Sequence, residues 1–193
     1  MGDLDYRPFP EERDDEFSAL MRYAFSPEEG PYDPEADDDD RDHLGDYRGL
    51  FDADDPVAVC GHHDFTLRIR GRDRDAAGLS AVASPPEHRR EGHVERLLRE
   101  SLTEYRDDGV AFSVLWPFEH AFYRRYGWAT VSRYRWVETP PQRLAFAAEG
   151  SVDRTGDDGA DGSTGRFRRL GADDHEAAAD LLAETAERYD FTM

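Results

Sequence analysis

Apolar residues recur along the chain with two different periods, and the period separates expected strands from expected helices. Alternation over Asp5–Phe9 and His63–Gly71 predicts two strands, and in the second every other residue from Phe65 is apolar. Short apolar runs predict further strands, of which Val110–Trp116 is apolar enough to be buried on both faces of a sheet. The glycine- and charge-rich stretch Gly71–Gly78 predicts a turn. The remaining expected strands are Pro56–Cys60, Gly78–Ser84 and Trp128–Glu138.

Apolar residues at helical spacing predict three helices between these strands. The first covers Asp14–Phe25, the second follows Gly92 and ends at Asp107–Gly109, and the third runs from Pro117 to Gly127. Strands and helices in this order predict an α/β fold in which a mixed sheet is covered by helices. The apolar stripes are Phe17, Leu20, Met21 and Phe25 in the first helix and Val94, Leu97, Leu98, Leu102 and Tyr105 in the second.

The composition changes between Gly150 and Gly165, where glycine, aspartate, serine and threonine dominate. Such a stretch predicts a flexible linker. We therefore expect a first domain over residues 1–149, a linker over 150–165 and the start of a second unit over 166–193.

The segment after the linker resembles the beginning of the chain. At an offset of 161 residues the two segments align without a gap, each as a short strand followed by an acidic helix start. Two interpretations stay open: chance likeness between generic strand–helix units, or a second copy of the same fold. A second copy would present Leu181 and Leu182 to a partner, which favours self-association into a homo-oligomer or docking on the first domain. The aligned pairs are Tyr6 with Phe167, Arg7 with Arg168, Phe9 with Leu170, Leu20 with Leu181 and Met21 with Leu182.

The chain is strongly acidic, with 44 acidic residues against 24 basic ones, all of them arginine. The net charge of -20 favours adaptation to strong brine over attraction of cationic substrates, because at 1 M salt the Debye length is only ~3 Å. Nucleic acid is not expected as a partner, since phosphates need a basic stripe. The first ~30 residues hold no signal-like apolar segment and no apolar run could span a membrane, which predicts a cytoplasmic protein.

A basic pair, Arg89 and Arg90, lies between an expected strand and an expected helix. The first N–H groups of a helix have no partner within it and the helix macrodipole is positive there, so the junction predicts an anion site. Gly92 lets a ligand approach the backbone closely, and arginines add charge-assisted hydrogen bonds. The expected ligand is a phosphate or pyrophosphate compound. The alternative is a set of surface salt bridges to the abundant carboxylates.

Other candidate chemistry is weaker. His62 and Asp64 share one face of a strand, but two candidate ligands do not make a metal site, so we expect no metal. The run Asp37–Asp40 favours a solvated loop over a cation site. Cys60 is the single cysteine, which excludes an intrachain disulfide, and a small core residue is the expected role rather than a nucleophile.

Two motifs of the chain are similar to signatures of the GNAT N-acetyltransferases. In "VASPPEHRREGHVERLL", Arg89 and Gly92 match the acetyl-coenzyme A loop of that family, and Val94 stands where the family has glycine or alanine. "SVLWPFEHAFYRRYGWAT" resembles the second signature of the Eis-like (enhanced intracellular survival) branch. It carries the pair Phe122-Tyr123 and the aromatic-Gly-aromatic turn Tyr126–Trp128.

The resemblance implies a GNAT fold, with a mixed central sheet splayed between its two middle strands and helices on both faces. It implies acetyl-coenzyme A as cosubstrate, with the pantetheine inserted into the splay like an extra strand. It also implies that a second GNAT-like domain begins at Arg166. The implied cofactor-binding residues are Val82, Ala83, Ser84, Arg89, Arg90, Glu91, Gly92, His93, Val94 and Trp116.

The resemblance further implies direct attack of an amine on the acetyl carbonyl, with Tyr123 as general acid. A phenol of pKa ~10 stays protonated at neutral pH and can protonate a leaving thiolate. The alternative for Tyr123 is a half-buried core residue on a short helix. Glu119 and His120 stay open as bases acting through a water or as solvent-facing residues. The base that the branch takes from its last domain has no counterpart in these motifs.

The expected function is acetyl-coenzyme A-dependent N-acetyl transfer to a primary amine of a small molecule, with no nucleic-acid or membrane partner. The alternative is a non-catalytic acyl-coenzyme A-binding domain or an inactive fragment of a larger multidomain acetyltransferase. A salt-adapted interaction domain without a cofactor is the third class. The identity of the acceptor, the general base and the oligomeric state do not follow from the sequence.

Overall fold

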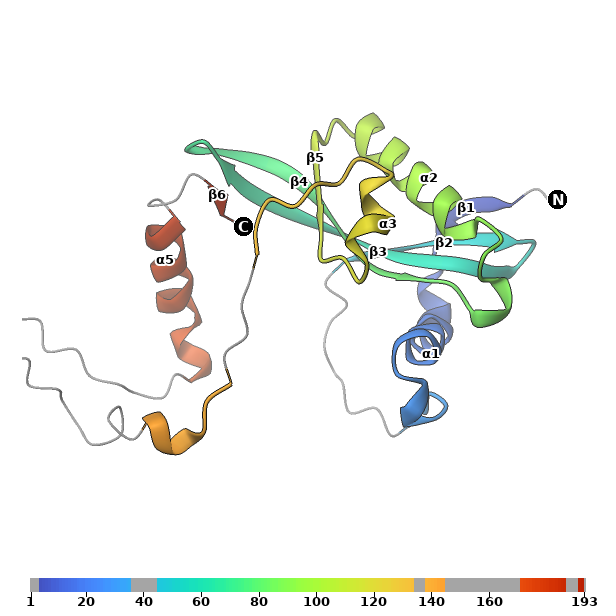
Figure 1. The fold of residues 1–193 in the computed structure, drawn as a ribbon, viewed down its shortest axis with the longest axis horizontal. Coiled ribbons are helices and arrows are strands. Elements are labelled where there is room, and N and C mark those ends of the chain that lie inside the picture. Colours follow the sequence, from blue (N-terminus) through green and yellow to red (C-terminus); the bar gives the residue numbers. More distant parts are fainter. Residues whose placement is uncertain (1–3, 36–44, 134–137, 145–170, 187–190, 193) are drawn as a thin grey trace, which may run out of the picture. The chain divides into compact units, whose positions relative to one another are not determined.

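The computed structural model describes residues 4–35, 45–133, 138–144, 171–186 and 191–192 of the 193-residue chain. It divides into two compact units, Met1–Ala129 with Tyr189–Met193, and Thr130–Arg188. The first unit holds a mixed sheet in the order β1-β2-β3-β4-β5, with β6 paired to β3 (Figure 1). The first four strands are antiparallel neighbours, and β5 runs parallel to β4. The strands are β1 (Asp5–Pro8), β2 (Asp46–Asp52), β3 (Asp55–Ile69), β4 (Arg72–Ala83), β5 (Phe112–Leu115) and β6 (Phe191–Thr192).

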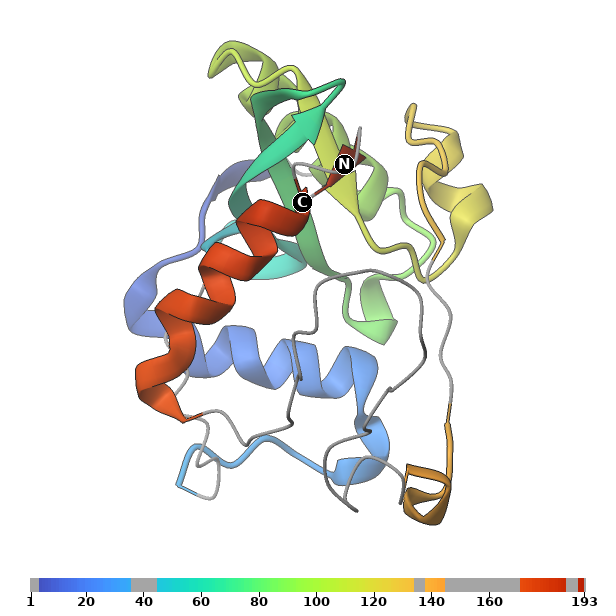
Figure 2. The same cartoon turned by 90° about the vertical axis from the view of Figure 1, so that its left-hand side faces the viewer.

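Helices cover both faces of this sheet (Figures 1 and 2). The predicted α/β fold with a mixed sheet is therefore confirmed. None of the described helices is both long and apolar enough to cross a bilayer. The α-helices are α1 (Asp14–Phe25), α2 (His93–Asp107), α3 (His120–Arg124) and α5 (His175–Ala186), and the 3₁₀ turns are Glu11–Arg13, Pro27–Glu29, Pro86–His88, Pro141–Leu144 and Ala172–Asp174.

The core consists of two apolar clusters, because successive strand residues point to opposite faces of the sheet. In β2, Leu50 joins the cluster under α2 and α3, whereas its neighbour Phe51 joins the cluster under α1. We call these the α2-side and the α1-side cluster. The α2-side cluster contains Leu4, Leu50, Val57, Ala58, Cys60, Leu79, Leu97, Leu98 and Tyr123, and the α1-side cluster contains Phe9, Phe17, Phe51, Val59 and Ala83.

The structure corrects the expected strand pattern around the β3–β4 hairpin. The two strands expected at Pro56–Cys60 and His63–Gly71 are one continuous strand, β3, because Gly61 and His62 pair with both β2 and β4. The turn expected over Gly71–Gly78 is wrong as well. The chain reverses within Arg70 and Gly71, whose φ angles of 51° and 73° suit a two-residue hairpin turn of type I′, and β4 begins at once.

Three further differences from the expected strands concern β2, β5 and the segment after α3. The strand β2 was not anticipated, although its two apolar residues are fully buried. β5 spans only Phe112–Leu115 and is not buried on both faces, since it lies at the end of the sheet order and Phe112 is 41% exposed. The strand expected over Trp128–Glu138 does not form at Trp128–Arg133, and Tyr134–Val137 lie outside the described residues.

Two expected helices differ in detail. Phe25 is 52% exposed at the C-terminal end of α1 rather than part of its apolar face. α3 begins at His120 and not at Pro117, because the Glu119 carboxylate caps it by accepting a hydrogen bond from the Ala121 N–H at 3.0 Å.

The second unit contains the helix expected in the tail, α5. The 3₁₀ turn Ala172–Asp174 directly precedes it, and the Asp174 carboxylate caps this turn by accepting a hydrogen bond from the Gly171 N–H at 2.8 Å. Leu181 and Leu182 are 63% and 71% exposed. The expected linker 150–165 and the expected strand at Arg166–Leu170 lie outside the described residues, so the domain boundaries stay predictions.

Candidate functional site

The strands β4 and β5 separate at the point where the family resemblance implies that the pantetheine inserts. β4 and β5 pair from Ala76–Phe112 to Leu79–Leu115, whereas β4 continues to Ala83. The last residues of β4 therefore face β3 on one edge and have no paired strand on the other within the described part of the chain. Free backbone groups at such an edge can accept an extended ligand by strand addition.

A β-bulge lies at the same point of β4. The register with β3 shifts between the pairs Gly61–Ser80 and Val59–Ala83, so Ala81 and Val82 together face a single residue of β3. Ala81 has a φ of 53°, a left-handed conformation that is rare for residues other than glycine. Bulges re-aim side chains and end pairing beside active sites. Val82 therefore lies in the bulge, and Ala83 is the first residue after it.

The chain then turns sharply into α2. Ser84 is buried, and its hydroxyl donates to the Val57 carbonyl at 2.8 Å, so its side chain is structural. Arg89 donates from Nε to the Ser84 carbonyl at 3.3 Å, which links the loop to the strand end. Arg90 and Gly92 both have positive φ, 67° and 86°, and Gly92 is the N-cap of α2.

No side chain caps the start of α2, as Gly92 has none to offer. The first N–H groups of this 15-residue helix are therefore available to an anion, and the two arginines precede them directly. Of the other predicted cofactor residues, Glu91 and His93 are hydrogen-bonded to each other at 2.9 Å. Val94 packs against the α2-side cluster, and Trp116, just past the end of β5, is 60% exposed.

Tyr123 lies in the α2-side cluster and is only 4% exposed. Its ring makes edge-to-face contacts with Phe118, Phe122 and Trp128, at centroid distances of 5.5, 5.1 and 5.9 Å. Burial, with a smaller contribution from Cys60, raises the pKa of Tyr123 to about 12. The phenol therefore stays protonated at every physiological pH, as a general acid must before it acts.

The sequence did not reveal a polar cluster buried between β1, β2, β3 and α2, which we call the Glu104 cluster. The Glu104 carboxylate accepts hydrogen bonds from Tyr6 and from the Arg48 guanidinium, the latter at 2.7 and 2.9 Å. The hydroxyl of the fully buried Ser101 lies 3.1 Å from His62 Nε2 and 3.3 Å from the Tyr6 hydroxyl. The members are Tyr6, Arg48, His62, Ser101 and Glu104.

Burial and charge set the protonation states of the Glu104 cluster. Burial opposes ionisation of Glu104, but the hydrogen bonds from Arg48 and Tyr6 outweigh it, so its pKa is lowered. Burial lowers the pKa of His62 to about 4, although Glu104 lies 3.9 Å away. His62 is therefore neutral at pH 7, and its contact with Glu104 is not an ion pair at that pH.

The sequence marked His62, Asp64 and Cys60 as candidates for metal binding or catalysis, and the structure shows where each lies. His62 is bound in the Glu104 cluster while Asp64 is exposed, so the structure does not bring them together as metal ligands. Cys60 is fully buried, and burial raises the pKa of its thiol to about 12. A thiolate nucleophile is thus not available there.

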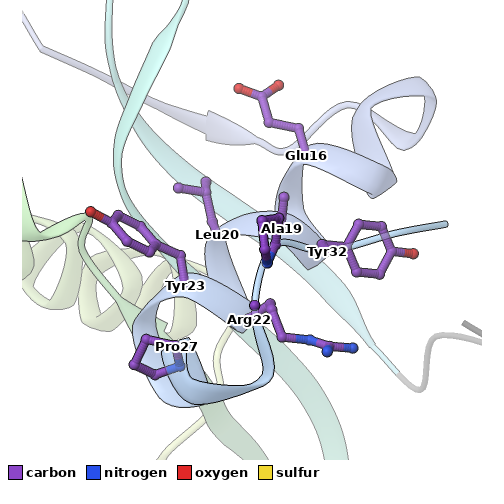
Figure 3. A pocket seen from close by; sticks show the side chains of 9 residues that line it. Glu16, Ala19, Leu20, Arg22, Tyr23, Pro27 and Tyr32 are labelled. Atoms are coloured by element: carbon purple, nitrogen blue, oxygen red, sulfur yellow. The ribbon is translucent and has the colours of Figure 1, made fainter. Parts of the chain in front are cut away.

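A hollow of about 540 Å³ lies between α1 and the segment that follows this helix (Figure 3). Its walls are mostly apolar, and the charges at its rim are paired: Arg22 with Glu29 at 3.0 Å, and Glu16 with Arg13. None of the predicted cofactor residues lines it. The lining residues are Glu16, Ala19, Leu20, Arg22, Tyr23, Pro27, Gly30, Pro31 and Tyr32.

A strand that separates from its parallel neighbour and leads to an uncapped helix start after a basic turn is the arrangement that the sequence resemblance implies for an acyl-coenzyme A-utilising α/β domain. The family model described as the acetyltransferase (GNAT) domain matches residues 5–131, about two thirds of the chain. The chain belongs to the GNAT acetyltransferase family.

Relatives agree with this assignment. An uncharacterized N-acetyltransferase of Streptomyces coelicolor is 31% identical over 107 residues, which are 52% of this chain and 26% of that protein. A similar protein of Streptomyces avermitilis is 26% identical over 106 residues, 54% of this chain and 26% of that protein. The chain thus spans about a quarter of the length of the curated relatives it matches.

Solved structures share the fold. A GCN5-related N-acetyltransferase from Kribbella flavida matches with a TM-score of 0.55 and 27% identity, over 65% of this chain and 32% of that chain. A probable N-acyltransferase from Enterococcus faecalis matches with a TM-score of 0.56 and 27% identity, over 64% and 32%. Eis1 from Mycobacterium abscessus, at 22% identity and a TM-score of 0.52 over 64% and 30%, shows the fold alone.

Proposed function

We propose that the chain is the cofactor-binding part of an acetyl-coenzyme A-dependent N-acetyltransferase of the Eis-like branch, which acetylates a primary amine of a small molecule. The observation that carries the proposal is the break in β4. The ladder to β5 ends at Leu79, the bulge at Ala81 follows, and the chain leads directly into the uncapped start of α2.

Each part of this region suits one part of the cofactor. The free edge at Val82 and Ala83 suits the amide groups of pantetheine, which pair as a strand does. The N–H groups at the start of α2 suit the pyrophosphate, and Arg89 and Arg90 supply charge-assisted hydrogen bonds. Trp116, at the end of the neighbouring strand β5, suits the thioester end.

In the proposed reaction, the amine nitrogen attacks the acetyl carbonyl, the C–S bond breaks, and the sulfur leaves as a thiolate. Tyr123 gives its proton to that thiolate. Burial raises the pKa of Tyr123 to about 12, above the ~8.5 of a thiol in water, so the phenol gives up its proton only when burial also raises the basicity of the leaving thiolate. The amine loses its own proton to solvent or to a base, for which Glu119 is a poor candidate because its carboxylate caps α3.

The cofactor assignment is tested by calorimetric titration of the chain with coenzyme A. Replacing Arg89 and Arg90 together with alanine should weaken binding by about 1.5–3 kcal/mol for each charged hydrogen bond lost. Arg99→Ala is the matched control, because Arg99 lies within α2, the helix that follows the two arginines, its side chain is 68% exposed, and it pairs with Glu95 at 2.9 Å. Equal affinity in the double variant and the control, both folded by circular dichroism, would refute the cofactor assignment.

A second candidate is non-catalytic acyl-coenzyme A binding, and one observation favours it. Tyr123 is 4% exposed and packed against three aromatic rings, as a purely structural residue would be. Tyr123→Phe separates the candidates, since it removes only the hydroxyl. Loss of a general acid lowers the rate by about 10²–10⁴ while coenzyme A affinity stays the same. The assay follows thiol release from acetyl-coenzyme A with a panel of small amines.

The catalytic and the non-catalytic candidate give different results in that assay. Release of thiol that depends on an amine and falls in Tyr123→Phe supports transfer with Tyr123 as the acid. Amine-dependent release that Tyr123→Phe leaves unchanged assigns the acid elsewhere. Tight cofactor binding without any turnover supports the non-catalytic candidate.

The proposed setting is the cytoplasm of a cell with high internal salt. The support is compositional: a net charge of -20 and the use of arginine for every basic residue. A high net charge keeps a protein soluble, but at low ionic strength the like charges repel one another and destabilise the folded state.

A further inference from the structure

Three metal-ligating side chains converge on the loop before α2. Donor atoms of His88, Glu91 and His93 all lie within 4.8 Å of one another. Glu91 Oε2 and His93 Nε2 are 2.9 Å apart, and the two imidazole rings lie at a centroid distance of 6.0 Å with an interplanar angle of 65°. Both histidines are partly buried, whereas Glu91 is exposed.

The backbone explains why residues so near in sequence can point to one place. His88 ends the 3₁₀ turn Pro86–His88, and α2 begins at His93. Between them Arg90 and Gly92 adopt left-handed conformations, with φ angles of 67° and 86°. These two reversals fold the segment back on itself, so the three donors lie on one side of the loop before any ion arrives.

The donors select a class of cation. Two imidazole nitrogens and one carboxylate oxygen suit Zn²⁺ and its neighbours Co²⁺ and Ni²⁺, whereas Mg²⁺ and Ca²⁺ prefer oxygen ligands alone. Bonds of about 2.0–2.2 Å separate tetrahedral ligands by about 3.4 Å, so side-chain adjustments of about one ångström suffice. The ion would replace the hydrogen bond between Glu91 and His93.

The local charge explains why the carboxylate is needed. The start of α2 and the two arginines make this region positive, which opposes a cation. Arg89 is turned toward the Ser84 carbonyl, at 3.3 Å, and Glu91 supplies the one negative charge among the three donors. A His–His pair alone would bind a divalent ion weakly at such a place.

We propose that His88, Glu91 and His93 form a site for a divalent transition-metal ion of the Zn²⁺ type, with at least one coordination position left to solvent or a ligand. The site rests on these side chains and not on the proposed acetyl transfer, so either can fail alone. The spacing His-x-x-Glu-x-His does not by itself indicate a site in the sequence, because the three donors converge only through the two left-handed residues between them.

The experiment uses the 193-residue chain, stripped with a chelator and titrated with Co²⁺, whose visible absorption reports nitrogen ligands. We expect saturable binding of about one ion per chain, displaced by Zn²⁺ and not by excess Mg²⁺. Excess Mg²⁺ also occupies the many surface carboxylates, which removes their contribution. Zn²⁺ affinity is then measured by competition.

Variants decide where the ion sits. His88→Gln, His93→Gln and Glu91→Gln should each lower the affinity at least about tenfold, since even second-shell partners of metal ligands contribute about 10–100-fold. His175→Gln, which changes a histidine of the other unit, should bind like the parent chain. Saturable binding that survives His88→Gln combined with His93→Gln, or no Mg²⁺-resistant binding at all, would overturn the proposal. Circular dichroism confirms that each variant is folded.

Discussion

The neutral histidine in the Glu104 cluster should make the first unit sensitive to acid. His62 is 8% exposed, and its Nε2 lies 3.1 Å from the hydroxyl of the fully buried Ser101. Burial lowers its pKa to about 4, from about 6.5 in an unfolded chain. We therefore expect His62→Gln, which cannot take up a proton, to remove part of the acid sensitivity of folding.

The sign follows from proton uptake. Between pH 6.5 and pH 4 the unfolded chain carries a proton on His62 and the folded chain does not, so the free energy of unfolding falls as the pH is lowered through this window. The full difference of about 2.5 units corresponds to about 3 kcal/mol, and the part lost between pH 7 and pH 5 is about 2 kcal/mol. The lowered pKa of Glu104 acts in the same direction, but only below its unfolded value of about 4.3. The interval from pH 7 to pH 5 thus reports mainly on histidines.

The assay is urea unfolding followed by circular dichroism at pH 7 and pH 5, at constant salt. The parent chain should lose about 2 kcal/mol more than His62→Gln over this interval. The six other histidines are common to the parent and the variant, so they cancel. If His62→Gln shows the full pH dependence of the parent, His62 is not buried as a neutral group and the reasoning fails.

Two further predictions concern the helix α2 and the residue that caps it. Glu104→Gln should lower the free energy of unfolding by about 2–3 kcal/mol. Breaking a fully buried ion pair costs about 3–5 kcal/mol, and the cost here is smaller because the side chains of Arg48 and Glu104 remain 15% and 26% exposed. Denaturant unfolding measures this loss, and a value under about 0.5 kcal/mol would contradict the prediction. Gly92→Ala should lower the free energy of unfolding by about 1 kcal/mol. The cause is the backbone φ of 86° and not a clash, since an added Cβ would meet nothing within 4 Å. Thermal unfolding measures the loss, and an unchanged melting temperature would contradict the prediction.

The sequence predicted α2 and the position of the basic turn before it, because both depend on local signals, whereas anion binding at this turn stays a prediction. Leu97 and Leu98 recur at helical spacing and are fully buried, and the basic pair before Gly92 stands where the helix begins. The Glu104 cluster could not be found in this way. Its members come from β1, β2, β3 and α2, and only the folded sheet brings them together.

The errors in the strand pattern have a physical cause too. Arg72–Asp75 are polar and exposed, so they lack the apolar alternation that marks a half-buried strand, yet they pair along the hairpin with Thr66–Ile69. β2 was missed because its buried residues, Leu50 and Phe51, are adjacent rather than alternating. Each points to a different side of the sheet, which a search for one apolar face cannot recognise.

Because the core is divided into two clusters, the packing beneath α1 is separate from the packing beneath α2. The α2-side cluster supports the helix that follows the basic turn, whereas the α1-side cluster supports the helix that borders the hollow of Figure 3. Only β2, β3 and β4 contribute to both, through alternate residues such as Ala58 and Val59. Substitutions in one cluster and in the other should therefore combine additively, so that the surroundings of α1 can diversify among descendants of one ancestral domain while the loop before α2 keeps its shape.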